Sequence, residues 1–354
     1  MIKKTKLITK RVFFIPAFFI AAVFMFGFAF FCYDFNAFIN RPLFSDAPKF
    51  SEAIMLQVPA KTSLKQLSQK LGELGIFSSA KQKYYFEWLT KLHQASRMLK
   101  AGEYELLPSD TPKILLQNLI NGKVMVYGFT IIEGWSFQDI LEALAKHPKL
   151  QKNLKELSAA EIIQKLNLPL QPEGWLYPAT YYFSLGFSDE AVLKKAHQFM
   201  HKILSDEWQN RAPNLSIHSA YESLILASII EKETALLSER KRISGVYQLR
   251  LKSNMRLQAD PTVLYGLYGG VSAHQKALSK NDLQQDTPYN TYKRSGLPPS
   301  PIAAPSLTSI RAACQPDFQG ELYFVATGHG GHYFSKNLNE HYQAVQKYQL
   351  NKNK

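Results

Sequence analysis

The sequence contains only two cysteines, Cys32 and Cys314, among its 354 residues. This excludes a disulfide framework and a cysteine-based zinc cluster, since both need several suitably spaced cysteines. The chain also lacks a Gly-rich phosphate-binding loop ending in Lys-Ser/Thr, a Gly-x-Ser-x-Gly nucleophile elbow and a His-Glu-x-x-His motif. Nucleotide hydrolysis, serine-hydrolase chemistry and zinc-peptidase chemistry are therefore disfavoured.

Acidic residues are scarce: 28 Asp+Glu against 42 Lys+Arg give a formal net charge of +14. Such a charge favours acidic partners, but it does not distinguish nucleic acid from anionic lipid or an acidic polymer. The length and a hydrophobic share of 46% allow a large buried core, spread over two or more domains. A chain that is disordered as a whole is excluded.

Charged side chains are absent from residues 12–33, a run long enough to cross a hydrocarbon core of about 30 Å as a helix. The preceding 11 residues carry no acidic side chain and five basic ones: Lys3, Lys4, Lys6, Lys10 and Arg11. The positive-inside rule then places the N-terminus in the cytoplasm and everything after Tyr33 outside. A cleaved signal peptide is the alternative, but the run is long and no small-x-small cleavage site follows it. We predict a retained membrane-spanning helix.

A short strand, a Ser or Thr helix cap and a short helix follow one another three times between residues 53 and 147. We predict the strands at residues 54–58, 103–107 and 124–132, with caps at Thr62 or Ser63, at Thr111 and at Ser136. A further helix is predicted at residues 80–92. This pattern fits an ordinary α+β subdomain as well as a dedicated ligand-binding module.

The rest of the chain is richer in helix, with segments predicted at residues 191–204, 219–237 and 239–252. Residues 281–305 are dense in Pro, Gly, Asn and Ser and predict a long ordered loop, of the kind that often lines a site. Two strands, at residues 322–326 and 332–334, precede a last helix. His329, His332 and His341 offer imidazole ligands, but no acidic or cysteine ligand lies near the first two, so no metal site is expected.

The most informative segment is the helix at residues 224–230, which is apolar on nearly every side and therefore buried. It runs directly into Glu231-Lys232-Glu233-Thr234. Two residues apart on a helix, Glu231 and Glu233 are rotated by about 200° from each other, so they need not share an environment. If Glu231 emerges into a cleft, burial disfavours its charged form and leaves a proton for general acid catalysis.

A second interpretation of the two glutamates is structural. They are then the polar end of a core helix, paired with a nearby cation such as Lys232, Arg240 or Lys241. Further polar residues gather at residues 256–262 and 289–292, where Tyr and Asn side chains can stack on a sugar or hydrogen-bond to it. Asp260-Pro261-Thr262 is also a sound helix start, with Asp as the cap.

At these segments the sequence resembles the endolytic murein transglycosylase family, once described as aminodeoxychorismate lyase-like. The matching segments are Glu-Gly-Trp-Leu-Tyr-Pro at 173–178, Ala-Ser-Ile-Ile-Glu-Lys-Glu-Thr at 227–234, Arg-Leu-Gln-Ala-Asp-Pro-Thr at 256–262, Tyr-Asn-Thr-Tyr at 289–292 and Gly-Leu-Pro-Pro at 296–299. Residues 323–326, His332 and His341 also fit. Three positions depart from the family pattern: Ala179 stands for Asp, Leu249 for Asn and Ser300 for Gly.

The resemblance implies an α+β protein with a single N-terminal transmembrane helix, a small LysM-like α/β module and a mixed α+β catalytic domain. The corresponding ranges are a cytoplasmic tail at 1–11, the transmembrane helix at 12–33, a connector at 34–52, the LysM-like module at 53–128 and the catalytic domain at 129–354. The implied location is the inner membrane, as a single-pass protein whose N-terminus is cytoplasmic and whose catalytic domain is periplasmic.

The resemblance also implies an activity: cleavage of the MurNAc–GlcNAc bond within nascent peptidoglycan strands to give 1,6-anhydro-MurNAc ends. Glu231 is then the single catalytic acid/base. Substrate contacts are expected from the matching segments, at Ser228, Glu233, Gln258, Asp260, Thr262, Tyr289, Asn290, Thr291 and Tyr292. No metal or cofactor is expected. The implied partners are peptidoglycan glycan strands and the inner membrane, with peptidoglycan synthases and division proteins as further candidates, and nucleic acid is not expected.

Two other functions remain open on sequence grounds. The chain can be a membrane-anchored peptidoglycan-binding scaffold without cleavage, or a hydrolytic muramidase with Glu233 as a second carboxylate, whose products carry reducing ends. A cytoplasmic lyase that needs pyridoxal phosphate is disfavoured by the topology. Glu231→Gln is expected from the sequence to abolish cleavage, because the amide cannot exchange the proton. Folding and binding are expected to stay nearly unchanged, because glutamine is isosteric with glutamate.

Overall fold

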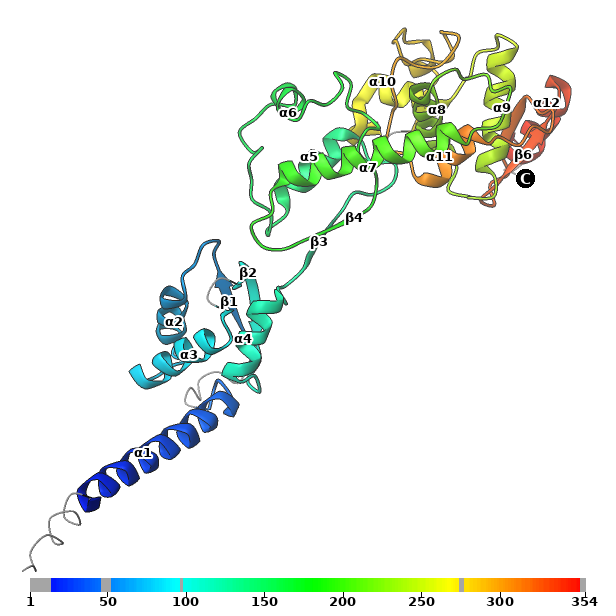
Figure 1. Ribbon diagram of the computed structural model, residues 1–354. Coiled ribbons are helices and arrows are strands. Elements are labelled where there is room, and N and C mark those ends of the chain that lie inside the picture. The colour runs from blue at the N-terminus through cyan, green and yellow to red at the C-terminus, as the bar shows by residue number, and fades with distance from the viewer. Residues whose placement is uncertain (1–13, 46–51, 96–97, 274–276, 351–354) are drawn as a thin grey trace, which may run out of the picture. The chain divides into compact units, whose positions relative to one another are not determined.

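The computed structural model describes residues 14–45, 52–95, 98–273 and 277–350, and it divides the chain into two compact units, residues 1–126 and 127–354 (Figure 1). The predicted cytoplasmic tail and the start of the predicted span lie outside the described residues. The mixed α+β class is confirmed, with every named sheet two-stranded and antiparallel. The domain functions assigned to residues 53–128 and 129–354, including the LysM-like character of the former, stay predictions.

The first unit contains four helices and one sheet among its described residues. They are α1 (Phe14–Asn40), β1 (Ile54–Val58), α2 (Leu64–Glu73), α3 (Ala80–Leu92), β2 (Gly102–Leu106) and α4 (Pro112–Asn121). Ser63 caps α2 and Thr111 caps α4, as predicted, with Pro112 in the first turn of α4. Strands β1 and β2 pair with Leu56 opposite Tyr104, and both side chains are buried.

Helix α1 extends past the predicted end of the span at Tyr33, into the predicted connector. Its part from Phe18 to Asn40 is long and apolar enough to cross a membrane. The extension has a packing reason, because Phe35 on the helix and Leu43 and Phe44 just after it are buried in the core of the first unit. Asp34 adds polar contacts to α3. The first unit is therefore built directly on the end of α1.

The second unit holds the rest of the chain. Its elements are β3 (Tyr127–Thr130), α5 (Phe137–Lys146), α6 (Ala159–Leu166), β4 (Thr180–Phe183), α7 (Asp189–Gln209), α8 (Ala220–Glu233), α9 (Arg240–Lys252), α10 (Asp260–Ala273), the 3-10 helix η2 (Asp282–Gln284), α11 (Leu307–Cys314), β5 (Tyr323–Ala326), β6 (His332–Ser335), α12 (Leu338–Val345) and the π-helix η3 (Gln346–Leu350). The third strand-and-helix repeat of the sequence belongs to this unit, where β3 pairs with β4. The three repeats therefore do not share one sheet.

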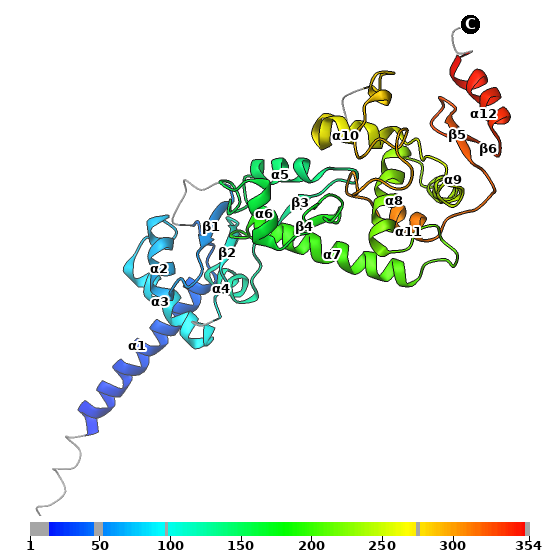
Figure 2. The ribbon, with the colours of Figure 1, turned by 90° about the horizontal axis from the view of Figure 1, so that it is seen from above.

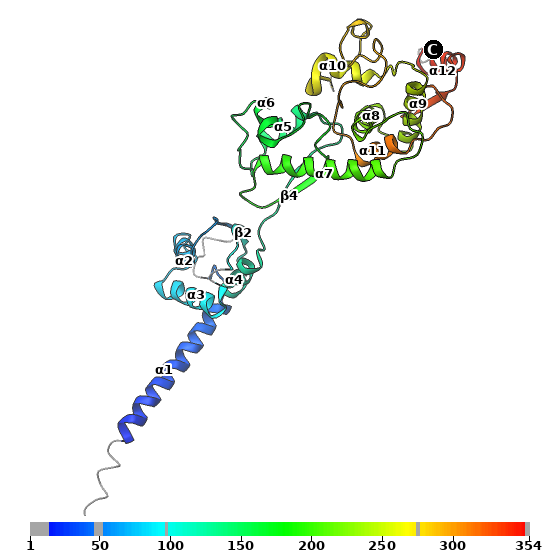
Figure 3. The same cartoon turned by 45° about the horizontal axis from the view of Figure 1, so that its top comes forward.

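Helix α7 runs from α5 and α6 to α8 and α11 (Figures 2 and 3), and its side chains belong to two apolar clusters of the second unit. Val192, Leu193 and Ala196 lie in the cluster around α5 and α6, whereas Met200 and Leu204 lie in the cluster around α8. Helix α8 is the centre of the latter, with every residue from 223 to 230 buried. It ends at Glu233, earlier than predicted, because the backbone of Thr234 is extended. Glu231 is thus in the last turn of a buried helix.

Candidate active site

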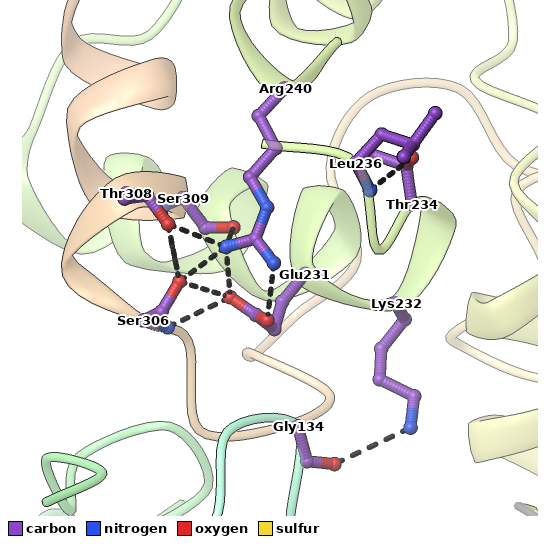
Figure 4. Close-up of polar contacts among 9 residues, drawn as sticks. All are labelled: Gly134, Glu231, Lys232, Thr234, Leu236, Arg240, Ser306, Thr308 and Ser309. Atoms are coloured by element: carbon purple, nitrogen blue, oxygen red, sulfur yellow. Dashed lines mark hydrogen bonds and ion pairs between the residues drawn. The ribbon is translucent and has the colours of Figure 1, made fainter. Parts of the chain in front are cut away.

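Glu231 projects from the end of α8 into a set of hydrogen-bond donors (Figure 4). Its side chain is only 5% exposed, as is that of Arg240, the first residue of α9. Arg240 Nη2 donates to Oε1 of Glu231 at 2.9 Å, and Nη1 donates to Oε2 at 3.0 Å. Such a bidentate contact fixes the plane of the carboxylate as well as its position. The ion pair anticipated by the structural interpretation therefore exists.

Ser306, 75 residues away in the sequence, supplies two more donors to the same carboxylate. Its backbone N–H donates to Oε2 of Glu231 at 2.9 Å, and its hydroxyl lies 2.5 Å from that atom. Ser306 is also the N-cap of α11, so the backbone of the first helical turn holds it in place. The hydroxyls of Ser306, Thr308 and Ser309 also lie within hydrogen-bond distance of Arg240 Nη1, whose two hydrogens they share with Glu231. Both carboxylate oxygens of Glu231 thus accept hydrogen bonds from fixed donors.

Glu133 is an exposed carboxylate near enough to this site for its pKa to respond to the charges of Glu231 and Arg240. Partial desolvation raises its pKa, the negative charge of Glu231 raises it further, and Arg240 opposes the shift. The turn that carries Glu133 is tied to the segment leading to Ser306, because Gly134 N–H donates to Ala304 O at 2.8 Å and Ala304 N–H donates back to Trp135 O at 2.7 Å. Gly134 has φ +78°, a left-handed conformation that glycine adopts without strain.

Sequence reasoning did not identify Ser306 or Glu133 as site residues. A weak indication was available for each. Ser306 follows a proline-rich segment and precedes a short apolar helix, the usual place of a cap, and Glu133 precedes a glycine at a turn. Neither indication points to Glu231, because both contacts depend on how distant elements pack.

The other predicted site residues form a separate cluster, in which residues 258–262 meet residues 289–292. Gln258 N–H donates to Thr291 O at 3.2 Å, and Ala259 N–H donates to Thr291 Oγ1 at 3.0 Å. The hydroxyls of Thr262 and Thr291 are 2.9 Å apart, and Tyr292 OH donates to Asp260 at 2.5 Å. The structure therefore brings two of the matching segments together in one hydrogen-bonded cluster at the start of α10.

Several of these residues are interior. Ser228, Thr262, Asn290 and Thr291 are at most 2% exposed. Ser228 Oγ accepts from Ile302 N–H, and the Asn290 amide donates to two carbonyls of its own loop, so both hold the polypeptide in place. Gln258 and Asp260 are exposed, and Tyr289 and Tyr292 are half-buried. A direct substrate contact is sterically simplest for these last four, and for all nine it stays a prediction.

Glu233 belongs to this second cluster and not to the Glu231 site. Tyr247 OH donates to it at 2.5 Å, and Asp260 and Arg250 are its charged neighbours. Burial raises its pKa to about 7, and Asp260 adds to the shift, whereas the Tyr247 hydrogen bond and Arg250 oppose it. The rotation between the two glutamates thus places them among different partners, as predicted from helix geometry.

Ser300, where the family pattern has Gly, has a defined role here. Its hydroxyl is 2.7 Å from Tyr289 OH, and the Tyr289 ring lies against Tyr265 with centroids 4.9 Å apart. Tyr265 OH in turn donates to Glu173 at 3.1 Å. Glu173 is buried and also accepts from Phe137 N–H at 2.9 Å. A chain of contacts thus connects the 289–300 loop to the matching segment at 173–178.

Glu173 makes stability depend on pH. Burial raises its pKa from 4.5 to about 7, so the folded protein holds this proton more tightly than the unfolded chain. Its stabilising contribution is complete below about pH 4.5 and is lost as the pH rises to about 7. Glu173→Gln is expected to remove this pH dependence. Between pH 4.5 and about pH 7 the dependence amounts to on the order of 3 kcal/mol in the free energy of unfolding. The measurement is the free energy of unfolding from urea titration, compared between about pH 5 and about pH 8 for the variant and the unmodified protein.

The matched control for this prediction is Glu142→Gln, the same chemical change on a side chain that is 42% exposed. That control should keep the pH dependence of the unmodified protein, including the part due to Glu233. If Glu173→Gln keeps it as well, Glu173 does not titrate as its burial implies.

Comparison with known proteins gives a consistent picture. The sequence model of the YceG-like family matches residues 56–347. A Bacillus subtilis protein named endolytic murein transglycosylase is 31% identical over 323 residues, which cover 85% of this chain and 86% of that protein. A Streptococcus pneumoniae protein of the same name is 28% identical over 337 residues, 85% of this chain and 58% of its own length. The crystal structure of a yceG-like protein from Listeria monocytogenes has a TM-score of 0.52 and 33% identity, covering 82% of this chain and 99% of that one.

Proposed function

Because the chain belongs to the YceG-like family, we propose that it is an endolytic murein transglycosylase, an enzyme that cuts peptidoglycan glycan strands internally. The relatives that carry this name support the proposal, and the first of them is covered over 86% of its length. The basic composition suits a substrate whose lactyl and peptide groups carry carboxylates. The chain is accordingly assigned to the lyases that act on peptidoglycan.

We propose Glu231 as the catalytic acid/base, and its position carries this proposal. It lies in the last turn of the buried helix α8, and its carboxylate is held by fixed donors from two other elements, Arg240 of α9 and Ser306 at the start of α11. In the first step protonated Glu231 gives its proton to the glycosidic oxygen as the bond from that oxygen to C1 of MurNAc breaks. In the second step the C6 hydroxyl of MurNAc attacks C1, and Glu231 takes the hydroxyl proton. The product has a 1,6-anhydro ring, no water is consumed, and Glu231 is again protonated.

The neighbours of Glu231 suit both of its protonation states. The Ser306 hydroxyl can donate to a carboxylate and accept from a protonated carboxyl, so it can follow the proton by rotating. Arg240 Nη1 has three hydroxyl acceptors besides Glu231, which keep the guanidinium solvated while Glu231 is neutral. One carboxylate suffices because the attacking group belongs to the substrate, whereas ordinary glycosidases use two.

We further propose that α1 is a retained anchor in the inner membrane, with the N-terminus in the cytoplasm and the catalytic domain in the periplasm. Its length and apolar surface support a span, and its last residues are part of the core of the first unit. The basic residues before it support the orientation. Peptidoglycan synthases and division proteins remain candidate partners, since enzymes that build and cut the same strands must act near each other.

Two alternatives have support of their own. The Glu231–Arg240 pair is compatible with a glycan-binding scaffold without cleavage, because a buried carboxylate held by Arg is also an ordinary structural feature. A hydrolytic muramidase needs a second carboxylate, and the structure makes Glu133 the candidate in place of Glu233, since Glu133 is the one coupled to Glu231.

Product chemistry distinguishes these functions. Peptidoglycan is incubated with the full-length protein in detergent, and the fragments are identified by mass spectrometry. Anhydro-ended fragments support the transglycosylase, and reducing ends would assign hydrolysis, which Glu133→Gln should then abolish and Glu233→Gln should not. Binding to peptidoglycan without any fragment would assign the scaffold.

Ser306→Ala is expected to lower turnover about 10- to 100-fold, since a hydrogen bond to a charged group contributes about 1.5–3 kcal/mol. The backbone N–H of residue 306 still reaches Glu231 in this variant. The matched control is Ser188→Ala, which removes the cap of α7 and touches no part of the site. Ser188→Ala should lose about 1 kcal/mol of stability as a cap loss. Ser306→Ala should lose more, because its hydroxyl also contacts the buried Glu231–Arg240 pair, and only Ser306→Ala should lose activity. Equal activities would separate Ser306 from catalysis.

A further inference from the structure

Helix α3 runs back along the end of α1, toward the part of α1 that enters the membrane. Near the start of α3 the ring of Phe77 lies 5.8 Å from Phe38. Further along, the ring of Trp88 lies 4.5 Å from Phe35 and 5.0 Å from Phe31. An ion pair of 3.0 Å between Lys81 and Asp34 adds a polar contact between the two helices. Side chains of the first unit therefore pack directly against the end of α1.

The depth of this contact follows from helix geometry. A hydrocarbon core of about 30 Å takes about 20 residues at a rise of 1.5 Å each. Counted along the sequence from Arg11, the last charged residue before the apolar run, 20 residues end at Phe31, so we place the exit of α1 from the hydrocarbon close to Phe31. Trp88, packed against Phe31, is then level with the lipid headgroups. The part of α3 beyond Trp88 continues in the same direction.

The exposed side of α3 carries large apolar side chains at this level. Tyr84 and Leu92 lie four residues before and after Trp88, so the three side chains form one stripe along the helix. Tyr84 is 59% exposed and Leu92 is 55% exposed, and just after the helix Met98 is 53% exposed. Lys91 and His93, beside Leu92, are exposed as well. Trp and Tyr with neighbouring basic residues are the side chains that gather at membrane–water interfaces.

We propose that the edge formed by Tyr84, Trp88, Leu92 and Met98 lies in the headgroup layer of the bilayer that α1 crosses, and holds the first unit against the membrane surface. The inference rests on the proposed anchoring by α1. The bound partner is the phospholipid of that same bilayer, with apolar side chains inserted below the headgroups and Lys91 reaching their phosphates. The first unit then presents its remaining surface to the cell wall at a fixed height.

The test measures depth in the bilayer with single fluorescent labels. Full-length protein with Cys32→Ser and Cys314→Ser is placed in vesicles of phosphatidylethanolamine and phosphatidylglycerol, and one cysteine is introduced at Leu92, Lys65 or Phe24. Lys65 lies on α2, which is farther than α3 from the start of α1 in every ribbon view (Figures 1, 2 and 3). Phe24 is exposed in the middle of α1. Each label is quenched by lipids that carry the quencher either near the headgroup or deep in the acyl chains.

We expect the Leu92→Cys label to lose fluorescence chiefly to the shallow quencher, the Phe24→Cys label chiefly to the deep one, and the Lys65→Cys label to neither. A quenched label at residue 24 with an unquenched label at residue 92 overturns the docking and leaves the anchor intact. An unquenched label at residue 24 overturns the anchor itself. A label at residue 92 that is shielded in cells but not in vesicles would assign the edge to a protein partner and also overturn the proposal.

Discussion

Glu231→Gln is expected to abolish cleavage of peptidoglycan, with a loss of turnover of about 10²–10⁴-fold or more. The amide has no proton to give to the glycosidic oxygen and cannot take one from the C6 hydroxyl, so both proposed steps fail. The measurement is the yield of anhydro-ended fragments per hour by mass spectrometry. Glu142→Gln, an equal change of charge on an exposed side chain, is the matched control and should keep full activity.

The structure changes the expectation for the folding of this variant. Glutamine is isosteric with glutamate, but its amide nitrogen must face a donor, because the Glu231 carboxylate accepts from Arg240 on both oxygens and from Ser306 on one. Arg240 also keeps a buried charge without its counterion. We therefore expect a measurable loss of stability, and activity must be compared at a temperature where the variant is folded by circular dichroism. A folded Glu231→Gln variant with full activity would refute the assignment.

Arg240→Met is expected to destabilise the second unit by about 3–5 kcal/mol, since it leaves the buried carboxylate of Glu231 without its partner. Methionine retains much of the apolar volume of the arginine side chain, so the loss of stability is due mainly to the missing charge. The measurement is the free energy of unfolding from urea titration. The control is Arg294→Met, whose ion pair with Asp286 is solvent-exposed and whose loss should cost about 0–1 kcal/mol.

A double variant distinguishes the contribution of the Glu231–Arg240 ion pair to stability from the contributions of the two separate side chains. With Glu231→Gln and Arg240→Met together, neither charge is left buried, and we expect a protein more stable than Arg240→Met alone. The coupling between the two sites should be about 0.5–3 kcal/mol, as for other residues in direct contact. Strictly additive losses would contradict the ion pair as the reason for the destabilisation.

Much of the local structure could be predicted from the sequence. The caps of α2, α4 and α5, the buried helix before Glu231 and the last two strands lie where periodicity and cap chemistry placed them. These features depend on residues three or four apart, or on the alternation of neighbouring side chains, so the chain specifies them locally. The different surroundings of Glu231 and Glu233 follow from the same helix geometry.

The tertiary structure decided what surrounds those elements. It chose Arg240 from among three candidate cations for Glu231, and brought in Ser306 and Glu133 from 75 residues downstream and from a turn before α5. It also ended α1 inside the core of the first unit, where the sequence predicted a connector, and paired β3 with β4, a strand that the sequence analysis did not predict. Such contacts depend on how whole faces fit together over long sequence separations, which no local pattern of side chains encodes.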